Sequence, residues 1–186
     1  MTGENVLKLK RMSDDALKYP VGKFSPRENY SMADINQHIN AIATLPEQIE
    51  SLTKTFSAQQ FNTPYREGGW TGLQVVHHLA DSHMNAYIRF KWTLTEDTPT
   101  IKAYNEKLWA ETPEVKLDPK LSIALLHALH QKWSALLKSL SEKDFQKQFL
   151  HPETKKHMPL DRLTAMYAWH GEHHLGHLKI IAGKPV

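Results

Sequence analysis

The chain has 186 residues, which fits one domain because domains average roughly 150 residues. Lys and Arg number 23 against 20 for Asp and Glu, and a net charge of +3 spread along the chain does not indicate nucleic acid or an anionic membrane as a partner. Cysteine is absent, which excludes disulfides, thiolate metal ligands and a cysteine nucleophile, and leaves imidazole and carboxylate groups to hold any metal.

The first thirty residues are expected to form an irregular lead-in that packs on the main body, residues 31–186. They hold Pro20, Gly22 and Pro26 among polar residues and show no sustained hydrophobic period. The first part of the lead-in carries acids and bases without the apolar core of a signal peptide, and no window reaches the roughly 18 apolar residues of a membrane span. We therefore expect a cytoplasmic protein.

Two segments in the first half of the chain have the spacing of an amphipathic helix. The first follows Ser31 and contains Pro46, which should kink it. The second opens at Thr71 and Gln74, which match a capping box, and runs to about Leu94. The apolar stripe of the first helix is Ile35, Ile39, Ile42, Leu45, Ile49, Leu52 and Phe56.

Two further helices are predicted in the second half, after the long connection Thr95–Asp118. Asp118 and Pro119 mark the start of the third helix as N-cap and first helical residue. The stretch 141–159 contains a turn at His151–Thr154 and has room for two short strands. The stripes are Leu125, Leu129, Trp133, Leu136 and Leu140 in the third helix, and Leu160, Leu163, Tyr167, His170, His174, His177 and Ile181 in the fourth. These elements predict an all-α fold, an antiparallel four-helix bundle with at least one long crossover.

Three histidines occupy the stripe of the fourth helix that should face the core, namely His170, His174 and His177. A buried imidazole without a partner costs about 1–3 kcal/mol, against a folding margin of about 5–15 kcal/mol for a whole domain. A bound metal ion would compensate for this cost. The sequence therefore predicts a metal site on the fourth helix.

His170 and His174 are the favoured ligand pair, because residues four apart lie on the same face of a helix. His173 and His177 share this spacing, but His173 lies off the inward stripe. A catalytic metal site usually has three protein ligands and an open position, so one more ligand is needed.

The third ligand is expected from the second helix, where His77, His78 and His83 point in three directions and periodicity does not choose among them. His78 heads a polar row that continues with Ser82, Asn85 and Arg89. Such a row is ordinarily a solvated face, although next to a cleft it would line a pocket. No role is assigned to His38 or His130, and the pair His127 and His130 has nothing acidic nearby to support a metal.

Five segments together form a more specific pattern than any histidine spacing. They are PVGKFSPRE at 20–28, TPYREGGWT at 63–71, QVVHHLADSHMNAYIRFKWTLTEDTP at 74–99, AYNEKLW at 103–109 and WHGEHHLGHL at 169–178. With these residues the chain resembles the DinB-like metalloprotein superfamily and, within it, the YfiT group of metal-dependent hydrolases. The resemblance covers about residues 19–182.

The resemblance implies a bundle in the up-down-down-up arrangement, with one divalent metal ion per subunit. The family's ligand on the second helix stands eight residues after a tryptophan and just before a leucine, which falls on His78; its His-x-x-x-His pattern falls on His170 and His174. The ion would be Zn²⁺ or Ni²⁺, and the protein a cytoplasmic homodimer. The superfamily commonly has Gln where this chain has His177, which leaves open an extra ligand or a proton-transfer group there.

The resemblance also implies that the ion activates water to hydrolyse a small-molecule substrate. Related members are thiol S-transferases that act on bacillithiol or mycothiol, so a metal-dependent S-transferase acting with a low-molecular-weight thiol is the alternative. A non-catalytic, metal-stabilised binding bundle is the third possibility. Asp81 and Glu172 are the acids nearest to these ligands in sequence, and are candidates to orient a ligand or to act as a base.

Overall fold

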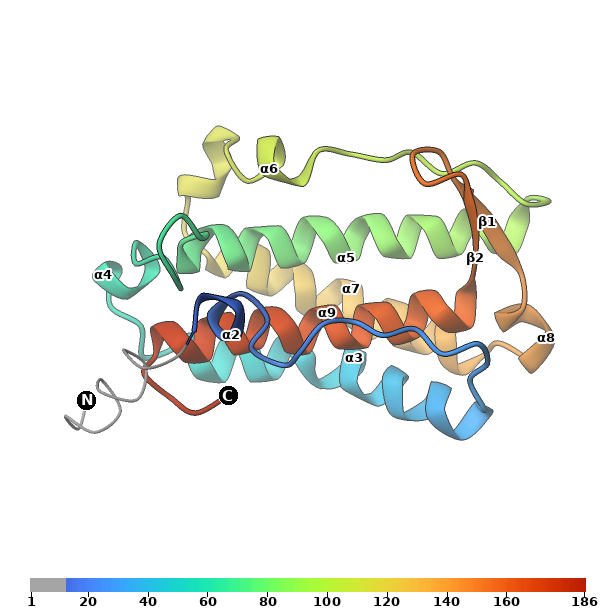
Figure 1. Ribbon diagram of the computed structural model, residues 1–186, viewed down its shortest axis with the longest axis horizontal. Helices are drawn as coiled ribbons and strands as arrows, with labels where there is room; N and C mark the ends of the chain where they lie inside the picture. Colours follow the sequence, from blue (N-terminus) through green and yellow to red (C-terminus); the bar gives the residue numbers. More distant parts are fainter. Residues whose placement is uncertain (1–12) are drawn as a thin grey trace.

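The computed structural model describes residues 13–186 (Figure 1). Four long helices form a bundle, and short helices and one hairpin occupy the connections. The long helices are α3 (Met32–Thr53), α5 (Gly72–Thr95), α7 (Lys120–Lys138) and α9 (Leu160–Ile181). The shorter elements are α2 (Asp14–Lys18), α4 (Ala58–Phe61), α6 (Glu106–Trp109), η1 (Pro113–Lys116), α8 (Glu142–Phe145), β1 (Gln148–His151) and β2 (Lys156–Pro159). The prediction of an all-α four-helix bundle is confirmed.

The start signals of the long helices act largely as predicted. Thr71 and Gln74 form a reciprocal capping box at the start of α5, so two backbone N–H groups that lack a helical partner are satisfied. The third helix begins one residue later than predicted, with Pro119 at the cap position. The carboxylate of Asp118 still accepts a hydrogen bond from the backbone N–H of Lys120, at 2.9 Å.

The long helices run up, down, down and up, the order that the resemblance implied. Because α5 and α7 are parallel, the connection between them returns along the bundle, as the segment carrying α6 does in Figure 1. The contacts that fix these directions are His77–Ser122 and His83–His130 between α5 and α7, Ile42–His130 and Glu50–His127 between α3 and α7, and Ser82–Tyr167 and Gly72–Ile181 between α5 and α9.

The third helix is rotated relative to the predicted stripe. Leu125 is 43% exposed, whereas Leu126 is fully buried, and Leu140 lies beyond the end of α7. The rotation turns Ser122 and His130 inward, where they hydrogen-bond histidines of α5. Sequence periodicity counts apolar residues and so misses polar residues that are buried by pairing with one another. The buried residues of α7 are Ser122, Ile123, Leu126, Leu129, His130, Trp133, Ser134 and Leu137.

The described part of the lead-in, residues 13–30, packs along α9. Trp169 donates a hydrogen bond from its indole N–H to the carbonyl of Gly22, at 3.1 Å. The prediction of an irregular segment is wrong for Asp14–Lys18, which forms helix α2 behind an N-cap at Ser13. A helix of five residues is too short to show a hydrophobic period. Residues 1–12 of the predicted lead-in lie outside the described residues.

The connection 139–159 forms a hairpin, with β1 antiparallel to β2 and a turn at residues 152–155. A parallel bridge between Thr100 and Leu150 ties this hairpin to the connection that follows α5. This bridge anchors one end of the segment that carries α6 over the bundle. Within residues 13–186, no helix is long and apolar enough to cross a membrane.

Candidate metal centre

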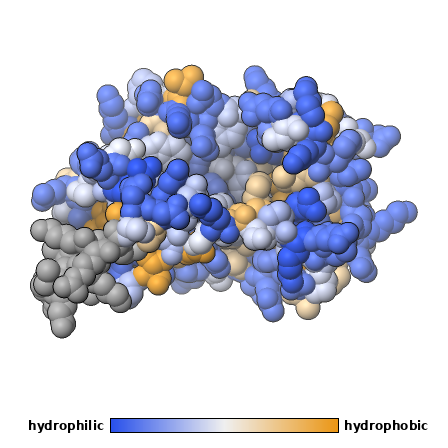
Figure 2. Space-filling model, in the orientation of Figure 1, coloured by the Kyte–Doolittle hydropathy of each residue, from blue (hydrophilic) through white to orange (hydrophobic). Residues whose placement is uncertain are grey.

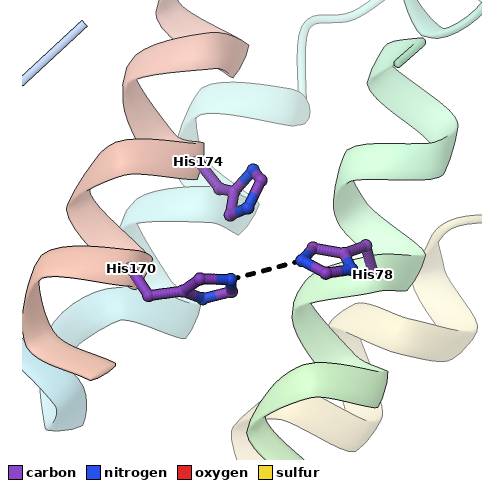
Figure 3. A group of neighbouring side chains, drawn as sticks. All are labelled: His78, His170 and His174. Carbon is purple, nitrogen blue, oxygen red and sulfur yellow. Dashed lines mark hydrogen bonds between the residues drawn. The ribbon is translucent and has the colours of Figure 1, made fainter. Parts of the chain in front are cut away.

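Three histidines from two antiparallel helices meet inside the bundle (Figure 3). α9 contributes His170 and His174, and α5 contributes His78, with the three rings directed toward one another. One ring nitrogen from each lies within 4.8 Å of the others, and the Nε2 atoms of His78 and His170 are 3.2 Å apart. The predicted ligand set is thus brought together by the fold.

The other two histidines of α5 make hydrogen bonds outside the group of three. His77 hydrogen-bonds the hydroxyl of Ser122 at 2.8 Å. His83 is fully buried and bonds to His130 of α7 and to His170. Within residues 13–186, only His78 of these three belongs to a group of side chains that could hold a metal ion.

Burial keeps these rings neutral, because removing an imidazolium from water is costly. Burial lowers the pKa of His78 to about 4, with a smaller contribution from His173. Burial also holds the pKa values of His170 and His174 well below the ordinary range, and neighbouring imidazoles add to the effect. At neutral pH each ring therefore has one N–H and one lone pair, the form in which histidine binds a metal.

A chain of hydrogen bonds behind His170 fixes which nitrogen carries the proton. Nδ1 of His130 lies 2.6 Å from the carbonyl oxygen of Ile42 and must donate to it, because a carbonyl only accepts. Nε2 of His130 then accepts from Nδ1 of His83 at 2.9 Å, and Nε2 of His83 accepts from Nδ1 of His170 at 3.2 Å. Nε2 of His170 keeps its lone pair, which accepts a hydrogen bond from Nε2 of His78 at 3.2 Å; a bound ion would take the place of that shared proton.

A second chain behind His174 starts at the lead-in. Nε2 of His177 lies 3.3 Å from the carbonyl oxygen of Lys18 and donates to it. Nδ1 of His177 then accepts from Nδ1 of His174, at 3.3 Å. His174 is thereby left with its lone pair on Nε2. Two backbone carbonyls, in different parts of the chain, thus determine the tautomers of both α9 ligands.

A further group, His173, His174 and His177, also has ring nitrogens within 4.8 Å of one another. In this group Nδ1 of His174 donates to Nδ1 of His177, so a hydrogen bond already joins two of the three rings. His177 therefore orients His174 in this structure, and an extra ligand at this position stays a prediction. His173 lies off the predicted stripe yet is buried, because Trp169 stacks on its ring and Tyr19 packs beside it at a tilt.

Aromatic side chains of the segment 63–71 close one side of the cluster. Trp70 lies over His78 and His174, with ring centroids 4.5 and 6.1 Å away. Tyr65 stacks on His177 at 3.7 Å. Gly68, at φ +63°, supplies the left-handed residue that lets this tight loop bring both aromatic rings to the same side. The loop shields the imidazoles from water.

Two cavities meet at His170. One, of about 450 Å³, is lined by all three predicted ligands together with Trp70, and the other, of about 640 Å³, extends from His170 toward the middle of α5. Exposed Glu106 lines both cavities. Figure 2 shows a hollow near the middle of this face, surrounded by hydrophilic side chains. A small molecule therefore has room beside the cluster.

Asp81 and Glu172 stand away from these cavities. Asp81 is half-buried, and burial, with a smaller contribution from Glu114, raises its pKa to about 6. Glu172 is exposed and lines a separate cavity between α3 and α9. The ring N–H groups of His170 and His174 go to other imidazoles, so neither acid orients a ligand. A role for either acid as a base stays a prediction, without a contact to support it.

Sequence reasoning missed the imidazoles behind the ligands. His83 and His130 are 47 residues apart and meet only because α5 and α7 pack in parallel. No spacing in the sequence signals this contact. The one signal in the sequence was the large number of histidines on three helices, more than a metal site needs, which meant that some could hydrogen-bond one another.

The fold and the site together define a class of protein, a four-helix bundle in which neutral imidazoles from two helices converge in an arrangement suited to a divalent metal ion. The chain belongs to the DinB superfamily, whose sequence model matches residues 41–178.

Relatives of the chain are similar over nearly their whole length. The protein named "Putative metal-dependent hydrolase YfiT" of Bacillus subtilis is 45% identical over 168 residues, which cover 90% of this chain and 94% of the relative. A relative from Bacillus licheniformis with the same kind of name is 45% identical over 166 residues, 89% of this chain and 94% of its own. The solved structure of YfiT, described as a "probable metal-dependent hydrolase with an unusual four-helix bundle topology", superposes with a TM-score of 0.88 at 44% identity, covering 90% of this chain and 96% of that one.

Proposed function

We propose that this protein is a metal-dependent hydrolase in which His78, His170 and His174 hold one Zn²⁺ or Ni²⁺ ion per subunit. The observation that carries the proposal is the convergence of three neutral imidazoles, two of them with Nε2 lone pairs fixed by hydrogen bonds. Three nitrogen ligands suit zinc or nickel and leave positions open for water or substrate. The names of the YfiT relatives support the same class of activity.

When bound, the ion would supply a Lewis acid that polarises a substrate oxygen and lowers the pKa of water from 15.7 toward about 7. The chain's own residues position the substrate and exclude bulk water. Trp70 covers the ligands from one side, and the two cavities receive the substrate. Because Glu106 lines both cavities, it is the carboxylate that we place to accept a proton.

The second candidate is a metal-dependent S-transferase, and the composition of the smaller cavity favours it. Among residues 13–186, Glu106 is the one acid that lines this cavity, while Lys18, Arg66 and Lys107 line it as cations. A thiol ionises near pH 8–9 without help, so it needs a general base less than water does. A low-molecular-weight thiol that carries negative charge would suit these surroundings.

Metal content tests the site itself. We expect His170→Ala and His174→Ala to lose bound metal while remaining folded, because each removes one of three ligands from an otherwise intact bundle. His78→Gln is expected to weaken binding in the same way. Elemental analysis and circular dichroism of the purified variants measure both quantities. His127→Gln, at an exposed histidine paired with Glu50, is the matched control and should retain its metal. Full occupancy in the ligand variants would contradict the assignment.

Activity then separates the candidate functions. Turnover of an ester or amide panel, lost on chelation and restored by Zn²⁺ or Ni²⁺, supports the hydrolase. Metal-dependent loss of thiol in the presence of an electrophile supports the S-transferase instead. Melting on chelation without turnover in either assay would support the non-catalytic, metal-stabilised bundle.

A further inference from the structure

Arg89 is a buried cation with no counter-charge. Its side chain lies on α5, the residue is 8% exposed, and its Nε has no hydrogen-bond partner. The ion pairs found within residues 13–186 do not include it. Arginine is almost never buried without a partner, because an unpaired charge loses its hydration and gains nothing in return. Such a group calls for an external anion.

Arg89 lines the cavity of about 640 Å³ that also reaches His170. Along α5 it follows His78 and Ser82 on one face, eleven residues and about 16 Å beyond the predicted ligand. A long side chain on a helix points back toward the N-terminus, so the guanidinium reaches toward the histidine cluster. Three members of the polar row on this helix, His78, Ser82 and Arg89, therefore line the cavities and are buried, whereas Asn85 lines neither cavity and is half-buried.

The side chains around Arg89 are hydrogen-bond donors. Burial raises the pKa of Tyr104 to about 12 and also raises that of Tyr167, so both phenols keep their protons. Ser82 donates to the hydroxyl oxygen of Tyr167 at 3.5 Å, which leaves the phenolic proton free to donate in turn. Acids line this cavity only at exposed positions, at Glu106 and Glu153 among the described residues.

We propose that Arg89 binds an anionic group, a carboxylate or a phosphate, of a substrate whose reactive group lies at the three-histidine cluster. The planar guanidinium can hold either group through two parallel hydrogen bonds, and Tyr104 and Tyr167 add neutral donors to the same anion. The substrate is therefore a small molecule with an anionic group at one end and the group that reacts at the other. Only one part of this inference rests on the proposed function, namely that the reactive end of the substrate lies at the three-histidine cluster.

Anion binding to the metal-free protein tests the proposal. Inorganic phosphate and glutarate are titrated separately by calorimetry into chelator-treated protein, so that neither anion can bind a metal ion. We expect at least one of the two to bind, and Arg89→Gln to weaken that binding roughly tenfold to a hundredfold, the usual effect of losing a charged hydrogen-bond pair. The anion that binds identifies the chemistry of the group. Arg162→Gln, at a partly buried arginine outside both cavities, is the matched control and should bind as the wild type does.

The outcomes are separable. Absence of binding by the metal-free wild type, or equal binding by Arg89→Gln, would overturn the anion site whatever the metal site does. If the protein, before chelation, takes up neither Zn²⁺ nor Ni²⁺ but still binds the anion at Arg89, the proposed function is overturned and the anion site stays intact. The variant should fold, because it removes an unpaired buried charge. If it does not, crystals of the wild type grown separately with phosphate and with glutarate decide, since the proposal requires density at the guanidinium for at least one of them and fails without it.

Discussion

A backbone carbonyl can only accept a hydrogen bond, and this property fixes the chemistry of the candidate centre at the level of single residues. The carbonyls of Ile42 and Lys18 each take the proton of one imidazole, and the next ring must then present its own proton. Metal-bound histidines usually donate to a carboxylate, carbonyl or water. Here the acceptors are His83 and His177, which are neutral rings and add no negative charge to the site.

The two substitutions His177→Leu and His177→Gln test this arrangement. Leucine leaves Nδ1–H of His174 without an acceptor, so the ring is free to rotate or to change tautomer. We expect metal affinity to fall roughly tenfold to a hundredfold, as is usual when the acceptor behind a ligand is lost. Glutamine can accept from His174 and donate to the carbonyl of Lys18, so its affinity should stay within a few-fold of the wild type. Competition with a coloured chelator measures both affinities, and equal values for the two variants would refute the orienting role.

At the scale of elements, the close packing of α3 against α9 sets how deep His170 lies in the bundle. Gly171 follows this ligand, and a Cβ at that position would lie 2.6 Å from a methyl carbon of Leu45. Glycine inside a helix costs about 1 kcal/mol relative to alanine. The helices therefore approach more closely here than any larger residue would allow, and the close approach sets the depth of the adjacent ligand.

Gly171→Ala is expected to lower the free energy of unfolding by about 1–2 kcal/mol, because crowding against Leu45 outweighs the gain in helix propensity. In a Leu45→Val background, which removes the crowding carbons, the same substitution should cost less. Urea denaturation of the metal-free variants gives the four free energies of this double-mutant cycle. Strictly additive changes in the free energy of unfolding would mean that a side chain at position 171 is not crowded by Leu45.

At the scale of the whole molecule, the candidate centre is built from groups of the lead-in and of all four long helices. The lead-in contributes the carbonyl of Lys18, α3 that of Ile42, and α5, α7 and α9 contribute imidazoles. Burial lowers the pKa of His130 and of His78 to about 4 and that of His177 to about 3, relative to about 6.5 in an unfolded chain. Folding therefore releases protons from these rings whenever the pH lies below about 6.5.

The metal-free protein should consequently lose stability as the pH falls from about 6.5 to about 4. In this range the unfolded state binds more protons than the folded state, and each such histidine contributes a slope of up to about 1.4 kcal/mol per pH unit. Asp81, whose pKa is raised to about 6, acts in the opposite direction but is a single group. Urea denaturation at pH 7, 6 and 5 measures the change. A flat profile would show that the rings are not buried in the neutral form.

The sequence by itself determined the helices, most of their start signals, and the shared face of His170 and His174 on α9, because these depend on local spacing along one helix. His170 and His174 lie four residues apart, and Thr71 caps the helix that begins beside it. The choice of His78 came from resemblance, since periodicity left three histidines equal. Only the tertiary structure decided the rotation of α7, the partners of His83 and His177, and the pocket around Arg89. Those features depend on contacts between helices that are distant in sequence, where a buried polar group is stabilised by a partner that no local pattern reveals.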